Sequence, residues 1–153
     1  MRVAVISDTH GLLRPEALKA LEGAEHILHA GDVGDPAILD TLRAIAPVTA
    51  IRGNIDEGGP CNHLPPSELI ELNGRNIYML HDVKKLDLNP EAVDIAAVVF
   101  GHSHKPLVEE RRGGVLFLNP GSAGPRRFQL PVTVAWLHIE ARGLRAQIVQ
   151  LKV

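Results

Sequence analysis

Short apolar runs alternate with amphipathic stretches over the first fifty residues of the chain. The runs at 2–6, 27–30 and 48–51 are rich in β-branched residues and stop at polar side chains, which is typical of strands buried on both faces. Residues 12–22 and 36–45 place apolar side chains at helical spacing, and each stretch has a proline near its start. Asp35 stands directly before Pro36 as an expected N-cap. The order strand, helix, strand, helix, strand predicts a parallel sheet.

The pattern changes after a loop rich in glycine and proline at 57–66. Short apolar segments are then separated by Gly or Asn turns, which predicts strands at 68–72, 76–80, 96–100, 107–110, 115–118, 132–138 and 144–151. The tripeptide Asn89-Pro90-Glu91 predicts the start of one short helix. The chain has no internal repeat, linker or low-complexity segment. We therefore expect one α/β domain, residues 1–153, with two sheets.

Composition narrows the class of protein. A chain of 153 residues, 45% hydrophobic and 22% charged, matches an ordinary globular domain. The net charge of -2 argues against a protein that coats nucleic acid. The single cysteine, Cys61, excludes an internal disulfide and fits a reducing compartment. The longest apolar stretch, 95–100, is far below the ~20 residues of a spanning helix, and polar residues at the N-terminus leave no room for a signal-peptide core. We expect a cytoplasmic protein without membrane contact.

Candidate metal ligands follow the first three predicted strands. Asp8-Thr9-His10 follows the first strand, Gly31-Asp32 the second and Gly53-Asn54 the third. The carboxyl ends of parallel strands lie at one edge of a sheet, where open α/β sheets place their sites. Carboxylate and amide oxygens suit divalent cations. Each motif taken alone is also compatible with a side chain that stabilises a loop or turn.

Histidines follow two later strands. His81 follows 76–80, and Gly101-His102-Ser103-His104 follows 96–100. Two histidines separated by one residue in a loop are difficult to explain as core packing, and imidazole is a common ligand of divalent transition metals. Five strands that each end in a potential ligand indicate one metal site. Its predicted ligands are Asp8, His10, Asp32, Asn54, His81, His102 and His104.

The ordered blocks D-x-H, G-D, G-N, a lone His and G-H-x-H resemble those of the calcineurin-like metallophosphoesterases. Their order and spacing are similar to the small single-domain bacterial and archaeal phosphodiesterase branch, and Asn119-Pro120-Gly121-Ser122 resembles the N-P-G-S turn of that branch. The resemblance covers nearly the whole chain. It implies a four-layer α-β-β-α sandwich, in which two facing mixed sheets are flanked by helices.

The resemblance also implies roles for the seven ligands. Asp8, His10 and His104 would hold one metal ion, Asn54, His81 and His102 the other, and Asp32 would bridge them, with Asp32, Asn54 and His81 as catalytic residues. The ions would be two divalent metals, manganese foremost, with Ni, Fe, Zn and Co also compatible. Two such ions can share a hydroxide that attacks a small phosphodiester or phosphomonoester substrate, so no covalent nucleophile is required. Ser122, which is not in a nucleophile elbow, is expected to serve the turn.

Two departures from the family pattern leave alternatives open. Ile55 stands where many larger members carry a histidine thought to protonate the leaving group, which predicts a preference for acidic leaving groups. Val83 replaces the second histidine of an H-G-H block, and Asp82 either orients a ligand or is a solvated loop residue. The alternative function is a catalytically weak or inactive protein-interaction scaffold, as this fold provides in an endosomal sorting complex. A purely structural metal site is less compatible, because such zinc sites are usually rich in thiolates.

The remaining polar residues carry no firm assignment. His29 is either a structural strand residue or a neighbour of the site, and the Arg126-Arg127 pair either meets a substrate phosphate or is solvated. The histidines expected to be structural are His26, His63 and His138. The oligomeric state, including a homo-oligomer, stays open.

Overall fold

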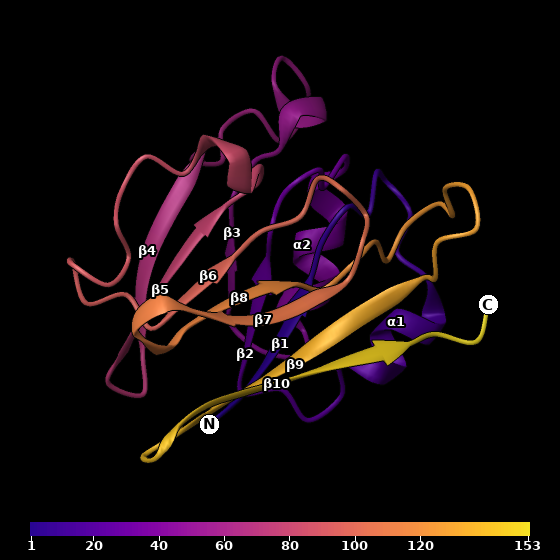
Figure 1. The fold of residues 1–153 in the computed structure, drawn as a ribbon. Coiled ribbons are helices and arrows are strands. Elements are labelled where there is room, and N and C mark those ends of the chain that lie inside the picture. The colour runs from indigo at the N-terminus through magenta and orange to yellow at the C-terminus, as the bar shows by residue number, and fades with distance from the viewer.

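Two five-stranded mixed sheets pack face to face in the computed structural model, which describes residues 1–153 (Figure 1). The first sheet has the order β10-β9-β1-β2-β3 and the second the order β4-β5-β6-β8-β7. The strands are β1 Arg2–Ile6, β2 His26–His29, β3 Val48–Ala50, β4 Ser67–Leu72, β5 Arg75–Leu80, β6 Ala97–Val99, β7 Leu107–Arg111, β8 Val115–Asn119, β9 Thr133–Glu140 and β10 Gly143–Gln150. The predicted pair of facing mixed sheets is confirmed.

The first sheet is built around β1. This strand pairs in parallel with β2 and antiparallel with β9, and β2 continues in parallel to β3. Side chains of β1 alternate between the two faces: Val3 and Val5 enter the layer between the sheets, while Ala4 and Ile6 face the helices. Because both faces are covered, the strand reads as a continuous apolar run.

Helices α1 (Pro15–Ala20) and α2 (Pro36–Arg43) cover the outer face of the first sheet (Figure 1). Helix α2 begins as predicted: the Asp35 side chain accepts a hydrogen bond from the N–H of Ala37. Helix α1 is shorter than the predicted 12–22. A turn closed by Leu12 N–H and Thr9 O precedes it, and Gly23, at φ 87°, follows it in a conformation that no right-handed helix contains.

The outer face of the second sheet carries no α-helix, so the helical layers that the resemblance implied are present on the first sheet only. The helix predicted at Asn89 is wrong: residues 89–94 form turns that close when Ile95 N–H donates to Pro90 O. Asp94 has a φ of 57°, which breaks a right-handed helix. The short 3-10 helix η2 (Val83–Lys85) and the following turns cover a small apolar cluster that includes Phe100 and Phe117.

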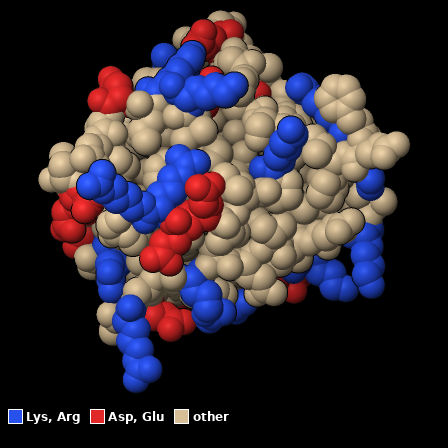
Figure 2. Space-filling model, viewed as in Figure 1, with Lys and Arg blue, Asp and Glu red and all other residues tan.

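No helix of the structure is both long and apolar enough to cross a lipid bilayer. On the face drawn in Figure 2, Lys and Arg side chains lie interspersed with Asp and Glu. This mixture matches the small net charge of -2 and provides no continuous basic surface on that face.

Candidate metal centre

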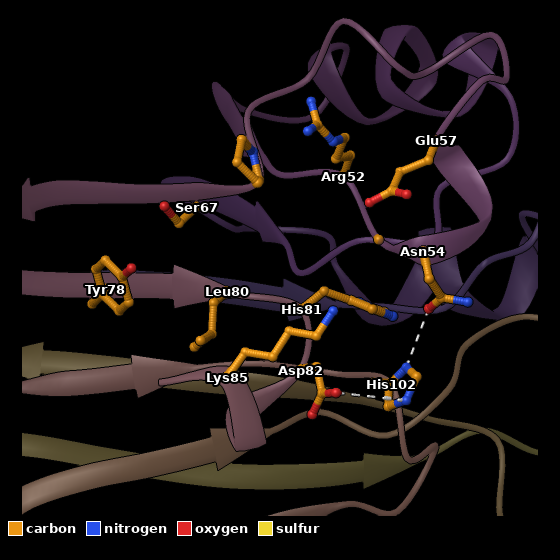
Figure 3. Close-up of a pocket in the computed structure, with 12 residues that line it drawn as sticks. Arg52, Asn54, Glu57, Ser67, Tyr78, Leu80, His81, Asp82, Lys85 and His102 are labelled. Carbon is orange, nitrogen blue, oxygen red and sulfur yellow. Dashed lines mark hydrogen bonds and ion pairs between the residues drawn. The ribbon is translucent and has the colours of Figure 1, made fainter. Parts of the chain in front are cut away.

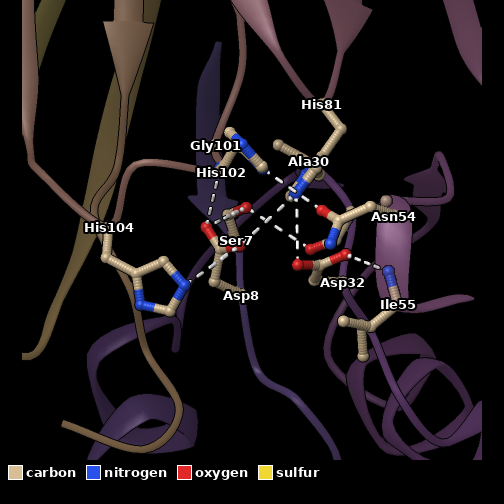
Figure 4. A network of polar contacts seen from close by, with 12 residues as sticks. Ser7, Asp8, Ala30, Asp32, Asn54, Ile55, His81, Gly101, His102 and His104 are labelled. Carbon is tan, nitrogen blue, oxygen red and sulfur yellow. Dashed lines mark hydrogen bonds and ion pairs between the residues drawn. The ribbon is translucent and has the colours of Figure 1, made fainter. Parts of the chain in front are cut away.

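The loops that follow β1, β2, β5 and β6 meet at one edge of the two sheets (Figure 4). Backbone hydrogen bonds tie them together: Asp8 N–H donates to Gly31 O, His10 N–H to Asp32 O, and Gly101 N–H to His81 O. Asn54, which opens the 3-10 helix η1 (Asn54–Asp56) after β3, joins them. All seven predicted ligands are therefore close together.

Ligand-type atoms form two overlapping groups at this edge. One group contains Asp8, His10 and His104, the other Asp8, Asp32 and His81, and the atoms of each lie within 4.8 Å of one another. The Asp8 Oδ1 atom is 3.5 Å from His104 Nε2 and 3.7 Å from His81 Nε2. The Asp32 Oδ2 atom is 3.4 Å from His10 Nε2 and 3.2 Å from His81 Nε2. Asp8 thus lies between His81 and His104, and Asp32 lies between His81 and His10.

Asn54 and His102 form the more exposed side of the site. The Asn54 Oδ1 atom lies 3.2 Å from His102 Nδ1, and the His102 ring is 5.2 Å from the His81 ring. The amide oxygen and imidazole nitrogen would complete the coordination of a cation held by His81.

Several ligand atoms are buried without a hydrogen-bond partner. Three of them, Asp8 Oδ1, His10 Nε2 and His81 Nε2, face one another across a small space that we call the shared gap. The fourth is His104 Nδ1. An unpaired buried polar atom is costly, so native proteins rarely keep one without a function. Acceptor atoms from a carboxylate and two imidazoles around one gap are the surroundings that a divalent cation requires. The residues therefore fit a metal ion.

The backbone of the site is strained at the ligands themselves. Eight non-glycine residues of the chain have a positive φ, and five of them are predicted ligands: Asp8, His10, Asp32, His102 and His104. The left-handed conformation costs about 1 kcal/mol or more per residue and persists only where surrounding structure enforces it. Strain concentrated in this way is typical of functional sites.

Glycines next to the ligands allow the loops to pack closely. A Cβ added to Gly53 would collide with Asp32 Oδ1, and a Cβ added to Gly101 would collide with Ser7 Oγ. The glycines of the G-N and G-H-x-H blocks are thus explained by steric contact with the neighbouring ligand loops.

Hydrogen bonds fix the orientation of His81 and Asp32. The Ala30 carbonyl accepts from His81 Nδ1 at 2.7 Å, which leaves His81 Nε2 directed at the carboxylates. Burial alone would lower the pKa of His81, but the hydrogen bond to Asp32 and the charge of Asp8 raise it above its ordinary value. Burial would likewise raise the pKa of Asp32, yet its bond to His81 and the N–H of Ile55 bring it below its usual range. The opposite shifts follow from the 3.2 Å separation of His81 Nε2 and Asp32 Oδ2.

His29 is a neighbour of the site, which was one of the two alternatives that the sequence left open. Its Nδ1 accepts from Gly31 N–H at 3.2 Å, so its Nε2–H donates to Thr9 Oγ1 at 3.0 Å. It therefore connects the D-x-H loop to the G-D loop. Complete burial lowers the pKa of His29 to about 4, so the ring is neutral at physiological pH.

Ser7 and Asp56 are site residues that the sequence analysis missed. Ser7 Oγ donates to Asp8 Oδ2 at 2.9 Å, which leaves Oδ1 free for the gap. The buried Asp56 carboxylate accepts from the N–H groups of Val33, Gly34 and Gly53, and so ties the loop after β2 to the loop after β3. Bonds to distant backbone have no signature in a sequence motif.

The two departures now have defined positions. Ile55 exposes 42% of its surface and serves the site through its N–H, which donates to Asp32 Oδ1. Asp82 caps η2 by accepting from Lys84 N–H, while its other oxygen lies 4.0 Å from His102 Nε2. Asp82 therefore approaches a ligand, although this ligand is His102 and not His81.

The N-P-G-S turn lies beside the site, as the resemblance implied. Asn119 donates to Gly101 O and Ser103 Oγ, and Ser122 Oγ donates to Asp8 O. Ser122 thus has the expected turn role. The remaining histidines lie apart from the ligands: His26 bonds Thr49, His63 is exposed, and His138 stacks on Trp136.

Comparison with known proteins places this geometry in a family. A family model described as the calcineurin-like phosphoesterase superfamily domain matches residues 1–142. A probable metallophosphoesterase of Methanocaldococcus jannaschii is 36% identical over 135 residues, which cover 80% of this chain and 68% of that protein. One of Methanothermobacter thermautotrophicus is 35% identical over 162 residues, with 98% of this chain and 92% of that protein covered.

Solved structures share the fold. A structure described as a novel archaeal phosphodiesterase has a TM-score of 0.76 and 21% identity, covering 97% of this chain and 100% of that chain. Vps29 of Entamoeba histolytica complexed with Zn²⁺ has a TM-score of 0.74 and 23% identity, covering 99% of this chain and 100% of that chain. At this identity the likeness establishes a common fold only.

Proposed function

The chain belongs to the calcineurin-like phosphoesterase superfamily, and from this premise we propose that it hydrolyses phosphodiester bonds of small substrates with the aid of two divalent cations. Phosphomonoesters are the second substrate class. We further propose that it acts in the cytoplasm as a single domain, alone or as a homo-oligomer, with manganese as the foremost metal and Ni, Fe, Zn or Co as replacements.

The observation that carries this proposal is the shared gap with its buried, unpartnered acceptors. Asp8, His10 and His104 would hold one cation, His81, His102 and Asn54 the other, and Asp32 would bridge them. When bound, two divalent ions would lower the pKa of an attacking water and neutralise the phosphate oxygens.

The protein's own groups prepare the site for this chemistry. Ser7 Oγ and the backbone N–H of His102 both donate to Asp8 Oδ2, so Oδ1 is left to the cation. The Ala30 carbonyl fixes His81, and the Ile55 N–H holds Asp32 Oδ1 at 3.0 Å. Because these partners are in place before substrate arrives, the site needs little rearrangement during the reaction.

Metal-dependent hydrolysis of bis-4-nitrophenyl phosphate by the wild type and Asp32→Asn tests the proposal. We expect the variant to lose about a hundred-fold or more in kcat and to bind Mn²⁺ more weakly in isothermal titration calorimetry. The exposed Asp87→Asn variant is the matched control and should behave as the wild type. If the wild type hydrolyses the ester with none of the divalent metals, the proposal that the protein is an enzyme is refuted.

The alternative is a protein-interaction scaffold on the same fold, which the likeness to Vps29 supports. A scaffold has no need of hydrolysis, so it predicts a folded wild type that shows no turnover with any metal. The complete set of seven ligands supports the enzyme over this alternative.

A further inference from the structure

A cavity of about 250 Å³ opens directly beside the candidate metal centre (Figure 3). Asn54, His81 and His102 belong to both, whereas none of the other four predicted ligands lines the cavity. Its remaining walls come from β4, β5, η2 and the loop after β3. The lining residues outside the metal centre that matter here are Arg52, Glu57, Tyr78, Leu80, Asp82 and Lys85.

The position of this cavity suits one part of a phosphoester. Asn54 and His102 lie at the boundary between the ligands and the cavity, so a group that leaves a phosphate on their side would enter the cavity. A protein cavity of about 150 Å³ is known to hold a benzene ring, so this larger cavity has room for a ring.

The lining indicates the chemistry of that group. Tyr78 and Leu80 supply apolar surface from β5, and Figure 3 shows Tyr78 at the end of the cavity away from His102. Glu57, Asp82, Arg52 and Lys85 contribute two charges of each sign, so the cavity has no net charge to attract a second phosphate. An uncharged, ring-bearing alcohol matches this lining.

Lys85 is the one lysine of the cavity. It ends η2, whose start is capped by Asp82, and Figure 3 shows its side chain extending toward His81. Lys85 forms no ion pair in the structure, so its ammonium group is available to a ligand. The neighbouring Lys84 is also exposed but does not line the cavity.

We propose that this cavity is the subsite for the leaving alcohol and that Lys85 stabilises the leaving oxygen, in place of the histidine absent at position 55. The inference rests on the proposed hydrolysis. The water oxygen bonds to phosphorus as the bond from phosphorus to the ester oxygen breaks, and the electron pair stays on that oxygen. The Lys85 ammonium group donates a hydrogen bond to it, and the proton lost by the attacking water neutralises it through solvent.

Two aryl esters that differ only in the leaving group test the role of Lys85. With 4-nitrophenyl methyl phosphate and phenyl methyl phosphate, we expect Lys85→Met to lower kcat/KM about ten-fold or more for the phenyl ester and under about three-fold for the nitrophenyl ester. The poorer leaving group carries more charge on oxygen in the transition state, so it needs the ammonium group more. Lys84→Met should leave both values unchanged.

A binding measurement tests the cavity without turnover. Tyr78 is the only tyrosine, so its ring resonances are identified directly in the proton NMR spectrum of the Zn²⁺-loaded protein. The non-hydrolysable phenylphosphonate should shift them more than methylphosphonate does. Equal shifts with both probes, or none, would overturn the assignment of the cavity.

The outcomes separate this inference from the proposed function. If Lys85→Met lowers kcat/KM equally for both esters, the leaving-group role is wrong while hydrolysis stands. If the wild type hydrolyses neither ester, the proposed function and the role of Lys85 are refuted together, and the response of Tyr78 still decides whether the cavity binds a ring.

Discussion

Acidification should destabilise the metal-free protein through His29. This ring is fully buried beneath the ligand loops, and its pKa falls from an unfolded value of 6.5 to about 4. The folded protein therefore binds a proton at His29 less readily than the unfolded chain does. The stability that depends on the neutral ring is complete above pH 6.5 and is lost as the pH falls toward 4.

The size of the loss follows from the two pKa values. The fall from 6.5 to about 4 corresponds to a limiting loss of about 3 kcal/mol in the free energy of unfolding. At pH 5 the loss amounts to about 2 kcal/mol, and at pH 4 to about 3 kcal/mol. Such a loss is a large fraction of the ~5–15 kcal/mol that stabilises a typical domain.

Urea unfolding of the wild type and His29→Asn in the presence of a chelator measures this contribution. Asparagine can still accept from Gly31 N–H but does not titrate, so it costs about 1 kcal/mol at pH 7.5 and removes the pH dependence of this site. The single, buried Trp136 reports unfolding by fluorescence. The wild type should lose about 3 kcal/mol more than the variant between pH 7.5 and 4.

The difference between the two proteins isolates His29 from other titrating groups. His81, whose pKa is raised, contributes stability at low pH in both proteins and so cancels. The loss of unfolding free energy between pH 7.5 and 4 is the quantity compared. If the wild type loses under about 1 kcal/mol more than the variant, His29 titrates near its ordinary pKa and the reasoning from burial is refuted.

Four further changes follow from the structure. Asp56→Asn should lower the free energy of unfolding by about 2–4 kcal/mol in urea titrations, because the amide cannot accept from three N–H groups; an unchanged midpoint would contradict this. Gly53→Ala should weaken Mn²⁺ binding about ten-fold or more by calorimetry, since its Cβ displaces Asp32; full affinity would show that the loop yields without cost. Ile55→His should raise kcat/KM for phenyl methyl phosphate about ten-fold or more relative to the nitrophenyl ester, and an equal effect on both would argue against proton donation from this position. Leu39→Ala, in the layer between α2 and the first sheet, should cost about 2–5 kcal/mol in urea without changing metal stoichiometry; a loss of the metal site in the folded variant would contradict that separation.

The strands that end at ligands were predictable because their signal is local. Continuous β-branched runs such as 2–6 are visible in the sequence, and so is the polar residue at which each run stops. Parallel pairing of β1, β2 and β3 then brings the ligand loops of the first sheet to one edge. The later histidines were predicted from the strands that they follow, and the resemblance implied which metal each ligand would hold.

The features that failed depend on tertiary structure. The helix predicted at Asn89 has a proper start signal, but the chain turns at Asp94 to enter β6, and the positive φ there prevents a helix. The carboxylate of Asp56 reads as an ordinary loop residue, since its three donors come from segments up to 23 residues away. Neither outcome is encoded in nearby residues.

The two carboxylates and three of the four ligand histidines follow strands of different sheets. Asp8 and Asp32 follow strands of the first sheet, whereas His81, His102 and His104 follow strands of the second. The two cations that these residues would hold join the sheets at their common edge, so only the docked pair of sheets can bind them with full affinity. Metal binding then stabilises the docked sheets by about 4 kcal/mol when the free metal concentration is a thousand times its Kd. The metal centre would thus stabilise the packing of the two sheets reversibly, and the concentration of available metal would set the size of that stabilisation.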